Sequence, residues 1–524
     1  MSRDLWIGLV LYLLSLVSLS ALRLGMPVVL MVACVWVIDW LILYGGLKGF
    51  LGGCGLGQVR SMVQLEKLAR THPRKTILGH GRLWQEGMAQ RYYHVQESVR
   101  GVTDPYSGMA QQGRLIGKER QQGLGHVLVM GAPGTGKTQL FRWLAHQAMA
   151  QESAVIFIDP KGSLGLFESL RQASERCGRP FYALLPARSK VSQSFNLLGH
   201  FSHSSELASR ITQLLPPLDQ KSVFGQFAWM ILNRIIAVML ELELPIQLTT
   251  IKKHVIDQGK NLQIMLRGRA CDSGVESGIR DTVNHDAVHY QKMILTLLSI
   301  LDPLTTGVLE QLLSPKKGTD SCQISTICEQ GGVFYAGLSA MTDANVANSL
   351  GSLILSDLAA IAGYRYDQQC RKPTVRILVD EAAEVTNPAF IQLLNKGREC
   401  GFEVVFAVQT LADLEMSMNS VAGARMMIGN ANHLICFRML DAATRQMIAE
   451  RSGMVRVPTI GWSRSKQKTV QLHGRGRGQG ESHSQSWRDA WRIPEARLAM
   501  LPDREFMALM GDGEVWLGHL PIVT

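Results

Sequence analysis

The chain has 524 residues, which sets a prior of roughly two to four domains and is enough to bury a sizeable core. Its formal net charge is +11 and its pI is about 9.2, which suits an anionic partner such as nucleic acid or a phospholipid surface. The nine cysteines are scattered without a C-x-x-C pair, which argues against a zinc site or a thioredoxin-like motif.

Two apolar runs near the amino terminus can each cross a bilayer as a helix. Leu5 to Leu22 carries no charge, and Leu24 to Leu47 is broken only by Asp39. Basic residues flank the pair on both outer sides, so the positive-inside rule places both ends and the main body in the cytoplasm. We expect a two-helix transmembrane hairpin over residues 1–50. The alternative is a cleaved signal peptide, which a second span disfavours. Asp39 is either a functional or subunit-contact residue or a solvated helix cap.

Residues 51–125 carry eleven Lys/Arg against five Asp/Glu. We interpret them as a basic connector and the start of a nucleotide-binding domain. The segment either lies on anionic lipid heads or forms a soluble edge of that domain.

The stretch from His126 to Ala148 organises the rest of the chain. An apolar run of strand length, His126 to Met130, precedes a glycine-rich loop that fits the phosphate-loop pattern G-x-x-x-x-G-K-[S/T], and a helical pattern follows. Glycines let backbone N–H groups turn inward around phosphates, and the helix start adds its positive dipole end. We expect the nucleotide to be bound by Gly131, Ala132, Pro133, Gly134, Thr135, Gly136, Lys137, Thr138 and Gln139.

Two side chains of this loop have specific expected roles. Lys137 can reach the β- and γ-phosphates, and the Thr138 hydroxyl can ligate Mg²⁺. The next apolar strand, 154–158, ends in the charged cluster Asp159-Pro-Lys161-Gly162, where α/β proteins place ligands. A further strand predicted at 181–185 completes the order β-α-β-α-β for this region.

From about residue 204 to 314 the apolar spacing is helical and no glycine-punctuated strand occurs, which predicts an all-helical insert. His285 and His289 stand four residues apart and could hold a metal. No third ligand is apparent, so a solvated helix face is the better interpretation.

Strands return at 332–338, and a long helix at 344–362 leads to the apolar strand Val375 to Val379, which ends in Asp380 and Glu381. Asp380 would hold Mg²⁺ through water, and Glu381 would polarise the attacking water. Gln409 ends the next strand, 404–408. It is placed to sense the γ-phosphate or position water, or it simply ends the strand with a hydrogen bond.

The carboxyl-terminal part continues with a strand at 431–437, a helix at 442–452 and last strands at 505–510 and 514–518. Between them, residues 461–488 are rich in Gly, Ser, Gln and basic residues, which predicts a flexible surface loop or hairpin. Residues 451–500 carry ten Lys/Arg against three Asp/Glu. Such a segment tracks a phosphate backbone or is solvated surface.

Taken together, two amino-terminal spans, GAPGTGKT, IDPKG, a helical insert, LVDEA, KGR and AVQT resemble the type IV secretion coupling proteins of the TraD/TraG group, relatives of the FtsK/HerA motors. The resemblance covers nearly the whole chain. It implies a RecA-like α/β P-loop NTPase domain over 126–203 and 315–524, with an all-helical domain at 204–314 that faces the substrate and relaxosome. It also implies a homo-hexameric ring at the bacterial inner membrane.

The resemblance implies roles for individual residues and partners. Lys137 and Thr138 bind phosphate and Mg²⁺, Asp380 and Glu381 perform the Walker B role, Arg398 is an arginine finger for the neighbouring subunit, and Gln409 is the strand-end glutamine. The cofactors are ATP and Mg²⁺. The partners are single- or double-stranded DNA, a relaxase or relaxosome, and inner-membrane components of the secretion system.

We therefore expect a DNA-dependent ATPase that docks processed conjugative DNA on the secretion channel and drives its transfer. One alternative keeps the motor and changes the cargo to protein effectors. Others are an FtsK-like chromosome translocase and a receptor that recruits cargo without hydrolysis. The helical insert disfavours the translocase, and the complete set of site residues disfavours the receptor.

Overall fold

The computed structural model describes residues 62–73, 75–98, 104–107, 109–119, 124–315, 321–471 and 474–521, which belong to one unit that starts at Val59. The two apolar runs expected to cross the membrane, with Asp39, lie outside the described residues.

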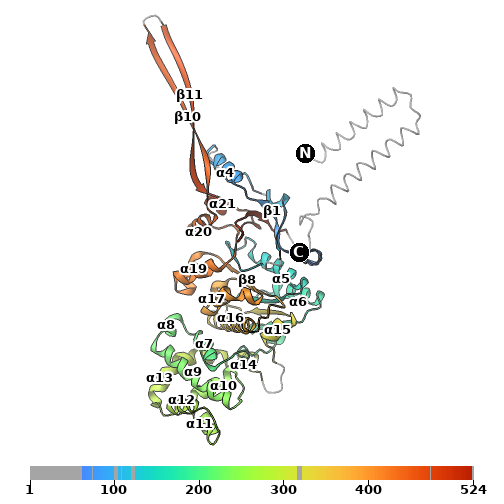
Figure 1. Ribbon diagram of the computed structural model, residues 1–524, viewed down its shortest axis with the longest axis vertical. Helices are drawn as coiled ribbons and strands as arrows, with labels where there is room; N and C mark the ends of the chain where they lie inside the picture. Colours follow the sequence, from blue (N-terminus) through green and yellow to red (C-terminus); the bar gives the residue numbers. More distant parts are fainter. Residues whose placement is uncertain are drawn as a thin grey trace, which may run out of the picture. The chain divides into compact units, whose positions relative to one another are not determined.

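An eleven-stranded mixed sheet runs through the described part in the order β2-β1-β13-β12-β9-β3-β8-β7-β4-β6-β5. Figure 1 labels β1 and β8 of this sheet. The seven strands from β9 to β5 are parallel, and the other four pair antiparallel. The strands are β1 (Lys75–Leu83), β2 (Arg114–Glu119), β3 (Val127–Met130), β4 (Ala154–Asp159), β5 (Phe181–Leu184), β6 (Val333–Gly337), β7 (Val375–Val379), β8 (Phe402–Val408), β9 (His433–Cys436), β12 (Glu505–Leu509) and β13 (Val515–His519).

The parallel strands follow from the continuous apolar runs in the sequence. Every residue of β3, β4, β6, β7, β8 and β9 is buried, as expected of strands covered by helices on both faces. The predicted strands at 154–158, 181–185, 332–338 and 404–408 are confirmed within one or two residues at each end.

The basic segment before the phosphate loop contributes more than a connector. β1 pairs with β13 and β2 pairs with β1, so this segment supplies one margin of the sheet. Trp84 and Tyr92, just after β1, are fully buried. For the described residues of 75–119, the soluble-edge alternative is therefore the one that the structure supports.

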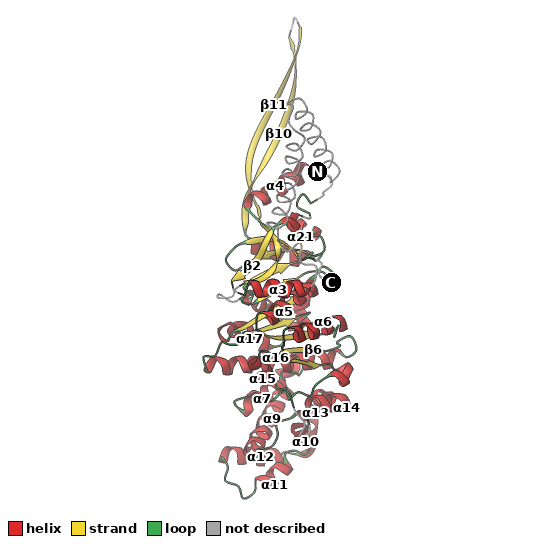
Figure 2. Ribbon diagram, turned by 90° about the vertical axis from the view of Figure 1, so that its right-hand side faces the viewer, coloured by secondary structure: helices red, strands yellow, loops and turns green. Residues whose placement is uncertain are grey.

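Helices cover both faces of the sheet (Figure 2). Right-handed crossovers place helices on opposite faces when the chain moves along the sheet in opposite directions. α3, α5 and α6 contact one another on one face, and α16 contacts α15 and α17 on the other. The bounds are α3 (Met62–Thr71), α5 (Lys137–Ala150), α6 (Leu164–Arg176), α15 (Ile324–Gln330), α16 (Ala344–Asp367) and α17 (Pro388–Lys396).

All secondary-structure elements described between Ser204 and Leu313 are helices: α7 (Ser204–Thr212), α8 (Pro217–Gln220), α9 (Val223–Glu241), α10 (Leu248–Ile256), α11 (Lys260–Leu266), α12 (Ser273–Val283), α13 (Ala287–Leu304) and α14 (Gly307–Leu313). A buried ion pair joins this insert to the sheet-covering layer, since Arg210 Nη1 on α7 lies 3.1 Å from Asp357 Oδ1 on α16. The rings of His285 and His289 are 5.0 Å apart, and no group of three metal-ligating side chains occurs among the described residues.

The segment 461–488, expected to be a loop or hairpin, is a hairpin and is longer than expected. β10 (Met454–Gln471) and β11 (Gly474–Trp491) form a separate two-stranded sheet that projects from the rest of the described body (Figure 2). The remaining helices are α4 (Glu86–Ser98), α18 (Leu411–Met418), α19 (Val421–Asn430), α20 (Ala442–Ser452) and α21 (Glu495–Met500).

Among the described residues, α9 and α16 are long and apolar enough to cross a membrane by length and composition alone. A third candidate arises if α13 and α14, which meet at 84°, are counted together. α16 packs on the sheet with most of its residues buried.

Candidate nucleotide site

The glycine-rich loop lies between the end of β3 and the start of α5, at the carboxyl edge of the parallel strands. Gly134 and Gly136 have φ of 77° and 122°, backbone conformations that L side chains rarely adopt. Gly131, Thr135 and Lys137 are buried, whereas Pro133, Gly134 and Thr138 are exposed and Ala132, Gly136 and Gln139 are partly exposed. The loop therefore presents an open rim above a buried base.

Two segments distant in the sequence hold the loop through backbone hydrogen bonds. Ala132 N donates to Arg438 O at 2.8 Å, and Arg504 N donates to Thr135 O at 2.8 Å. A Cβ on Gly131 would lie 2.8 Å from Phe437 Cβ, so the loop packs too closely there for any side chain. The amides at the start of α5 follow Gly136, which has no side chain to cap them, and they are suited to an anion.

Lys137 lies inside this loop. Its Nζ donates to Gly131 O at 2.5 Å and to Ala132 O at 3.1 Å. Burial lowers the pKa of Lys137, although the carboxylates of Asp380 and Glu381 act in the opposite direction. The Lys137 ammonium therefore lies at the loop near two carboxylates, whose negative charges balance part of its positive charge.

Asp380 directly follows β7, two strands away from β3 in the sheet. Thr138 Oγ1 donates to Asp380 Oδ2 at 2.8 Å, which joins the loop to the strand end. Burial raises the pKa of Asp380, and the hydrogen bond from Thr138 works against that rise. A hydroxyl and a carboxylate oxygen at this distance are the oxygen ligands that Mg²⁺ takes together with substrate phosphates.

Glu381 is held by two partners at the same carboxylate oxygen. Lys161 Nζ lies 2.6 Å from Glu381 Oε1, and Gln409 Nε2 donates to that oxygen at 2.9 Å. Glu381 itself has φ 54°, in the left-handed region, where the chain turns from β7 into the short 3-10 helix Ala382–Glu384. Strained backbone of this kind clusters at functional sites.

The turn after β4 fixes Lys161. Asp159 Oδ1 accepts from Lys161 N at 2.9 Å, Asp159 Oδ2 accepts from Ser163 N at 2.8 Å, and Tyr335 Oη donates to Asp159 Oδ2 at 2.7 Å. Burial on its own would lower the pKa of Lys161, but the hydrogen bond to Glu381 and the surrounding acids raise it. The sequence predicted a charged cluster containing Lys161 at a strand end where ligands bind, but it gave no individual role for Lys161. Its partner lies 220 positions away, beyond any spacing rule.

Arg398 is the predicted site residue that lies elsewhere in this chain. It is exposed on the 3-10 helix Gly397–Cys400, which directly precedes β8. Gln409 follows the other end of that seven-residue strand, so the two residues lie at opposite edges of the sheet, about 20 Å apart. The structure brings Lys137, Thr138, Asp380, Glu381 and Gln409 together and leaves Arg398 outside that group.

Comparison with known proteins supports the resemblance found in the sequence. Residues 374–502 match a family model described as the TraM recognition site of TraD and TraG. This segment begins next to β7 and includes Asp380, Glu381, Arg398, Gln409 and the β10–β11 hairpin. The resemblance to the TraD/TraG coupling proteins is thereby confirmed over this segment, about a quarter of the chain. A search of curated proteins gave no significant match.

Solved structures of TrwB share the fold. The bacterial conjugative coupling protein TrwB in its unbound monoclinic form is 16% identical and has a TM-score of 0.55, with 86% of this chain and 94% of that chain covered. The plasmid coupling protein TrwB with ADP and Mg²⁺ is 15% identical, with a TM-score of 0.56 and coverage of 86% and 95%. TrwB with the ATP analogue ADPNP is 17% identical and has a TM-score of 0.55, with 86% of this chain and 94% of that chain covered.

Proposed function

We propose that this chain is a DNA-dependent ATPase of the TraD/TraG kind, anchored in the bacterial inner membrane, which couples processed conjugative DNA to a type IV secretion channel and drives its transfer. One observation carries the enzymatic part. The glycine-rich loop, Asp380 and Glu381 meet at the carboxyl edge of one sheet, with Thr138 and Asp380 joined at 2.8 Å. The motifs come from segments some 240 residues apart, so their meeting is a property of the fold.

ATP and Mg²⁺ fit the residues present. The backbone amides at the start of α5 and Lys137 would hold the phosphates, and Thr138 and Asp380 would hold the metal ion. When bound, the nucleotide supplies a γ-phosphoryl group that water attacks in line, while Mg²⁺ neutralises the developing charge. TrwB has been solved with ADP and Mg²⁺ and with ADPNP, which supports this assignment through the shared fold.

Glu381 acts on the attacking water in this proposal. Its Oε1 is held by Lys161 and Gln409, so its orientation is set before the nucleotide arrives. The carboxylate accepts a hydrogen bond from the water and orients it toward the phosphorus. Gln409 fixes the carboxylate from the end of the neighbouring strand, β8, at the same edge of the sheet.

The coupling part rests on resemblance. TrwB is described as a conjugative coupling protein, and the matched family model is described as a TraM recognition site. We carry over a homo-hexameric ring, contacts with a relaxosome and inner-membrane secretion components, and DNA as cargo. The net charge of +11 favours an anionic cargo over most protein effectors.

The decisive test is ATP hydrolysis by the full-length protein in membranes, with and without single-stranded DNA, beside Lys137→Ala. We expect stimulation by DNA that disappears in the variant, because Lys137 is the phosphate-binding cation of the loop. Hydrolysis that ignores DNA but rises with a relaxase or effector protein would assign protein cargo instead. Hydrolysis that survives in Lys137→Ala would contradict the site itself.

A further inference from the structure

The β10–β11 hairpin is a regular two-stranded ribbon, and the contacts with the body that the described residues make lie at its base. Its 18 residue pairs run without a register shift from Met454 opposite Trp491 to Gln471 opposite Gly474. At about 3.4 Å per residue, the ribbon is close to 60 Å long. This ribbon is in addition to the sheet that builds the nucleotide site, so that site does not account for it.

Helix α4 clamps the base of the ribbon. Gln90 Nε2 donates to Arg456 O at 2.8 Å, and Tyr93 Oη donates to Trp491 O at 3.0 Å. The Arg488 guanidinium stands 5.6 Å from the centre of the Tyr93 ring. Both strands are therefore held at their base, and the ribbon extends beyond α4 (Figure 1).

The register sorts the residues of the distal half into two unlike faces. Directly opposed residues of an antiparallel pair share a face, and faces alternate along each strand. One face, which we call the cationic face, holds the pairs 464/481, 466/479, 468/477 and 470/475. Its basic members are Arg464, Lys466, Lys468, Arg475 and Arg477, and Glu481 is its one acid.

The opposite face, which we call the neutral face, holds the pairs 463/482, 465/480, 467/478, 469/476 and 471/474. These positions are Ser, Thr, Gln or Gly without exception. Along each strand of the distal half, residues of the cationic face therefore alternate with uncharged residues of the neutral face. All charged residues between Ser463 and Ser482 fall on one side of the ribbon.

The pattern of charge indicates the kind of partner. The four residue pairs of the cationic face form four successive levels, about 6.8 Å apart, which together carry five cations and one anion over roughly 20 Å. Protein interfaces are built around apolar and aromatic residues and are poor in lysine, and these four levels offer only Val470 as an apolar residue. A surface that inserts into lipid would also call for apolar residues, and a purely electrostatic contact with anionic lipid heads is the alternative that the vesicle measurement below separates. A regular polyanion needs no apolar residues.

We propose that the cationic face of the distal β10–β11 ribbon binds the phosphate backbone of nucleic acid. This proposal rests on the proposed function and adds to it the surface by which the motor contacts its cargo. A two-stranded β-ribbon also fits the width of a DNA major groove, so both single and double strands are accessible to this face. The neutral face leaves the other side of the ribbon uncharged.

The test compares variants that differ in where the charge stands. The first removes four cations from the cationic face: Lys466→Gln, Lys468→Gln, Arg475→Gln and Arg477→Gln. The second keeps the native net charge but moves two cations to the neutral face: Arg475→Gln and Arg477→Gln with Gln467→Arg and Thr469→Arg. The third, a matched control on the neutral face, is Ser463→Ala with Ser465→Ala.

Affinity for labelled single- and double-stranded oligonucleotides is measured with the full-length protein in neutral detergent, without nucleotide, over a range of salt concentrations. We expect the first variant to bind at least about tenfold more weakly, with a salt slope lower by about 3, because each lost phosphate contact removes roughly 0.7 to 0.9 from the slope. The second should not regain native affinity, and the third should match the native protein. The strand type that shows the larger loss identifies the natural cargo form.

Unchanged DNA affinity and salt slope in the first variant would overturn the proposal. Native DNA affinity in the second variant would also overturn it, because binding would then depend on net charge alone. Loss of binding to vesicles of phosphatidylcholine with 30 mol% phosphatidylserine, with DNA binding intact, would also overturn it in favour of a lipid contact. Basal ATP hydrolysis should be native in all three variants. Failure of the proposed function would instead appear as hydrolysis that survives in Lys137→Ala, so the two failures are distinguishable.

Discussion

At the scale of single residues, the site depends on how Glu381 is oriented. A glutamate at the end of a strand has several rotamers open to it, and the proposed mechanism needs one that faces the attacking water. Lys161 and Gln409 approach the same oxygen of Glu381 from two different loops, at 2.6 and 2.9 Å. Two partners on one atom restrict the carboxylate much more than one partner does, and they act as a unit.

This arrangement leads to a prediction for turnover. Lys161→Met and Gln409→Ala should each lower kcat by about tenfold, roughly 1.4 kcal/mol, while nucleotide affinity stays near native because neither change touches the glycine-rich loop. The double variant should lose less than the product of the two effects, because both act through Glu381. Steady-state hydrolysis and nucleotide titration measure the two quantities. Lys253→Met, an exposed lysine of α10, is the matched control.

Loss of nucleotide affinity with native kcat in Lys161→Met would show that this lysine binds phosphate directly. Fully multiplicative effects in the double variant would show that Lys161 and Gln409 act on separate groups.

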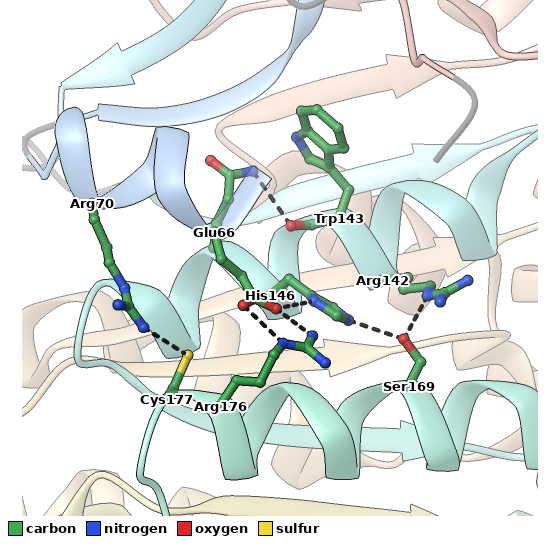
Figure 3. A network of polar contacts seen from close by, with 9 residues as sticks. Glu66, Arg70, Arg142, Trp143, His146, Ser169, Arg176 and Cys177 are labelled. Atoms are coloured by element: carbon green, nitrogen blue, oxygen red, sulfur yellow. Dashed lines mark hydrogen bonds and ion pairs between the residues drawn. The ribbon is translucent and has the colours of Figure 1, made fainter. Parts of the chain in front are cut away.

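At the scale of elements, α3 is fastened to α5, the helix that follows the glycine-rich loop, by a polar network centred on the buried side chains of Glu66 and His146 (Figure 3). Glu66 on α3 accepts from His146 Nδ1 on α5 at 2.8 Å and from Arg176 Nη2 on α6 at 2.6 Å. Ser169 on α6 contacts His146 Nε2 at 3.0 Å and accepts from Arg142 Nε at 2.6 Å. α3 is the first described helix after the expected membrane spans, so the network joins that end of the chain to the helix that begins at Lys137.

We predict that Glu66→Gln destabilises the protein by roughly 1 to 2 kcal/mol at neutral pH, because the buried carboxylate loses its charge-assisted hydrogen bond with Arg176, whose own side chain is about a third exposed and can be hydrated. Burial by itself would raise the pKa of Glu66, but hydrogen bonds from His146 and Arg176 lower it below the ordinary 4.5. A lowered pKa stabilises the fold fully above the ordinary value, and this contribution is lost as the pH falls through the folded-state pKa. The difference from the native protein should therefore shrink below pH 4.5.

Chemical unfolding at several pH values measures this difference. Glu168→Gln on α6 is the matched control, since Glu168 pairs with Arg171 at an exposed site and should change the free energy of unfolding by less than about 1 kcal/mol. Equal effects of the two substitutions would contradict a special role for the Glu66 network.

The elements also show what the sequence can predict. Continuous apolar runs predicted the parallel strands, and the phosphate-loop pattern predicted the β3–α5 junction. Local patterns missed β1 as a sheet strand, because it contains Gly79 and Gly81, carries a register shift between Ile77 and Gly79, and pairs with β13 more than 400 residues away. The ribbon was predicted only as a loop or hairpin, since the sequence of its distal half has no period-two hydrophobic pattern.

At the scale of the whole molecule, the position of Arg398 argues for a site shared between subunits. Arg398 lies at the amino edge of the sheet, whereas the glycine-rich loop and Glu381 lie at the carboxyl edge, about 20 Å away along β8. An arginine side chain does not span that distance. If Arg398 acts on a nucleotide, the nucleotide belongs to a neighbouring subunit, which a head-to-tail ring provides at every interface.

Mixing two inactive variants tests this arrangement. Lys137→Ala should abolish hydrolysis because it removes the phosphate-binding cation, and Arg398→Ala should abolish it because it removes the cation supplied to the neighbour. A ring with equal, random amounts of the two has native Lys137 and a native neighbouring Arg398 at roughly a quarter of its interfaces, so hydrolysis should return to about a quarter of native. If Arg398 served its own subunit, every subunit in the mixture would lack one required group and none would hydrolyse ATP. Lys137→Ala mixed with native protein is the control for coupling between sites: a loss in proportion to the share of the variant means that the sites act independently, as the estimate of a quarter requires. Restored activity in the mixture of two dead variants therefore distinguishes a shared site from an internal one without a structure of the ring.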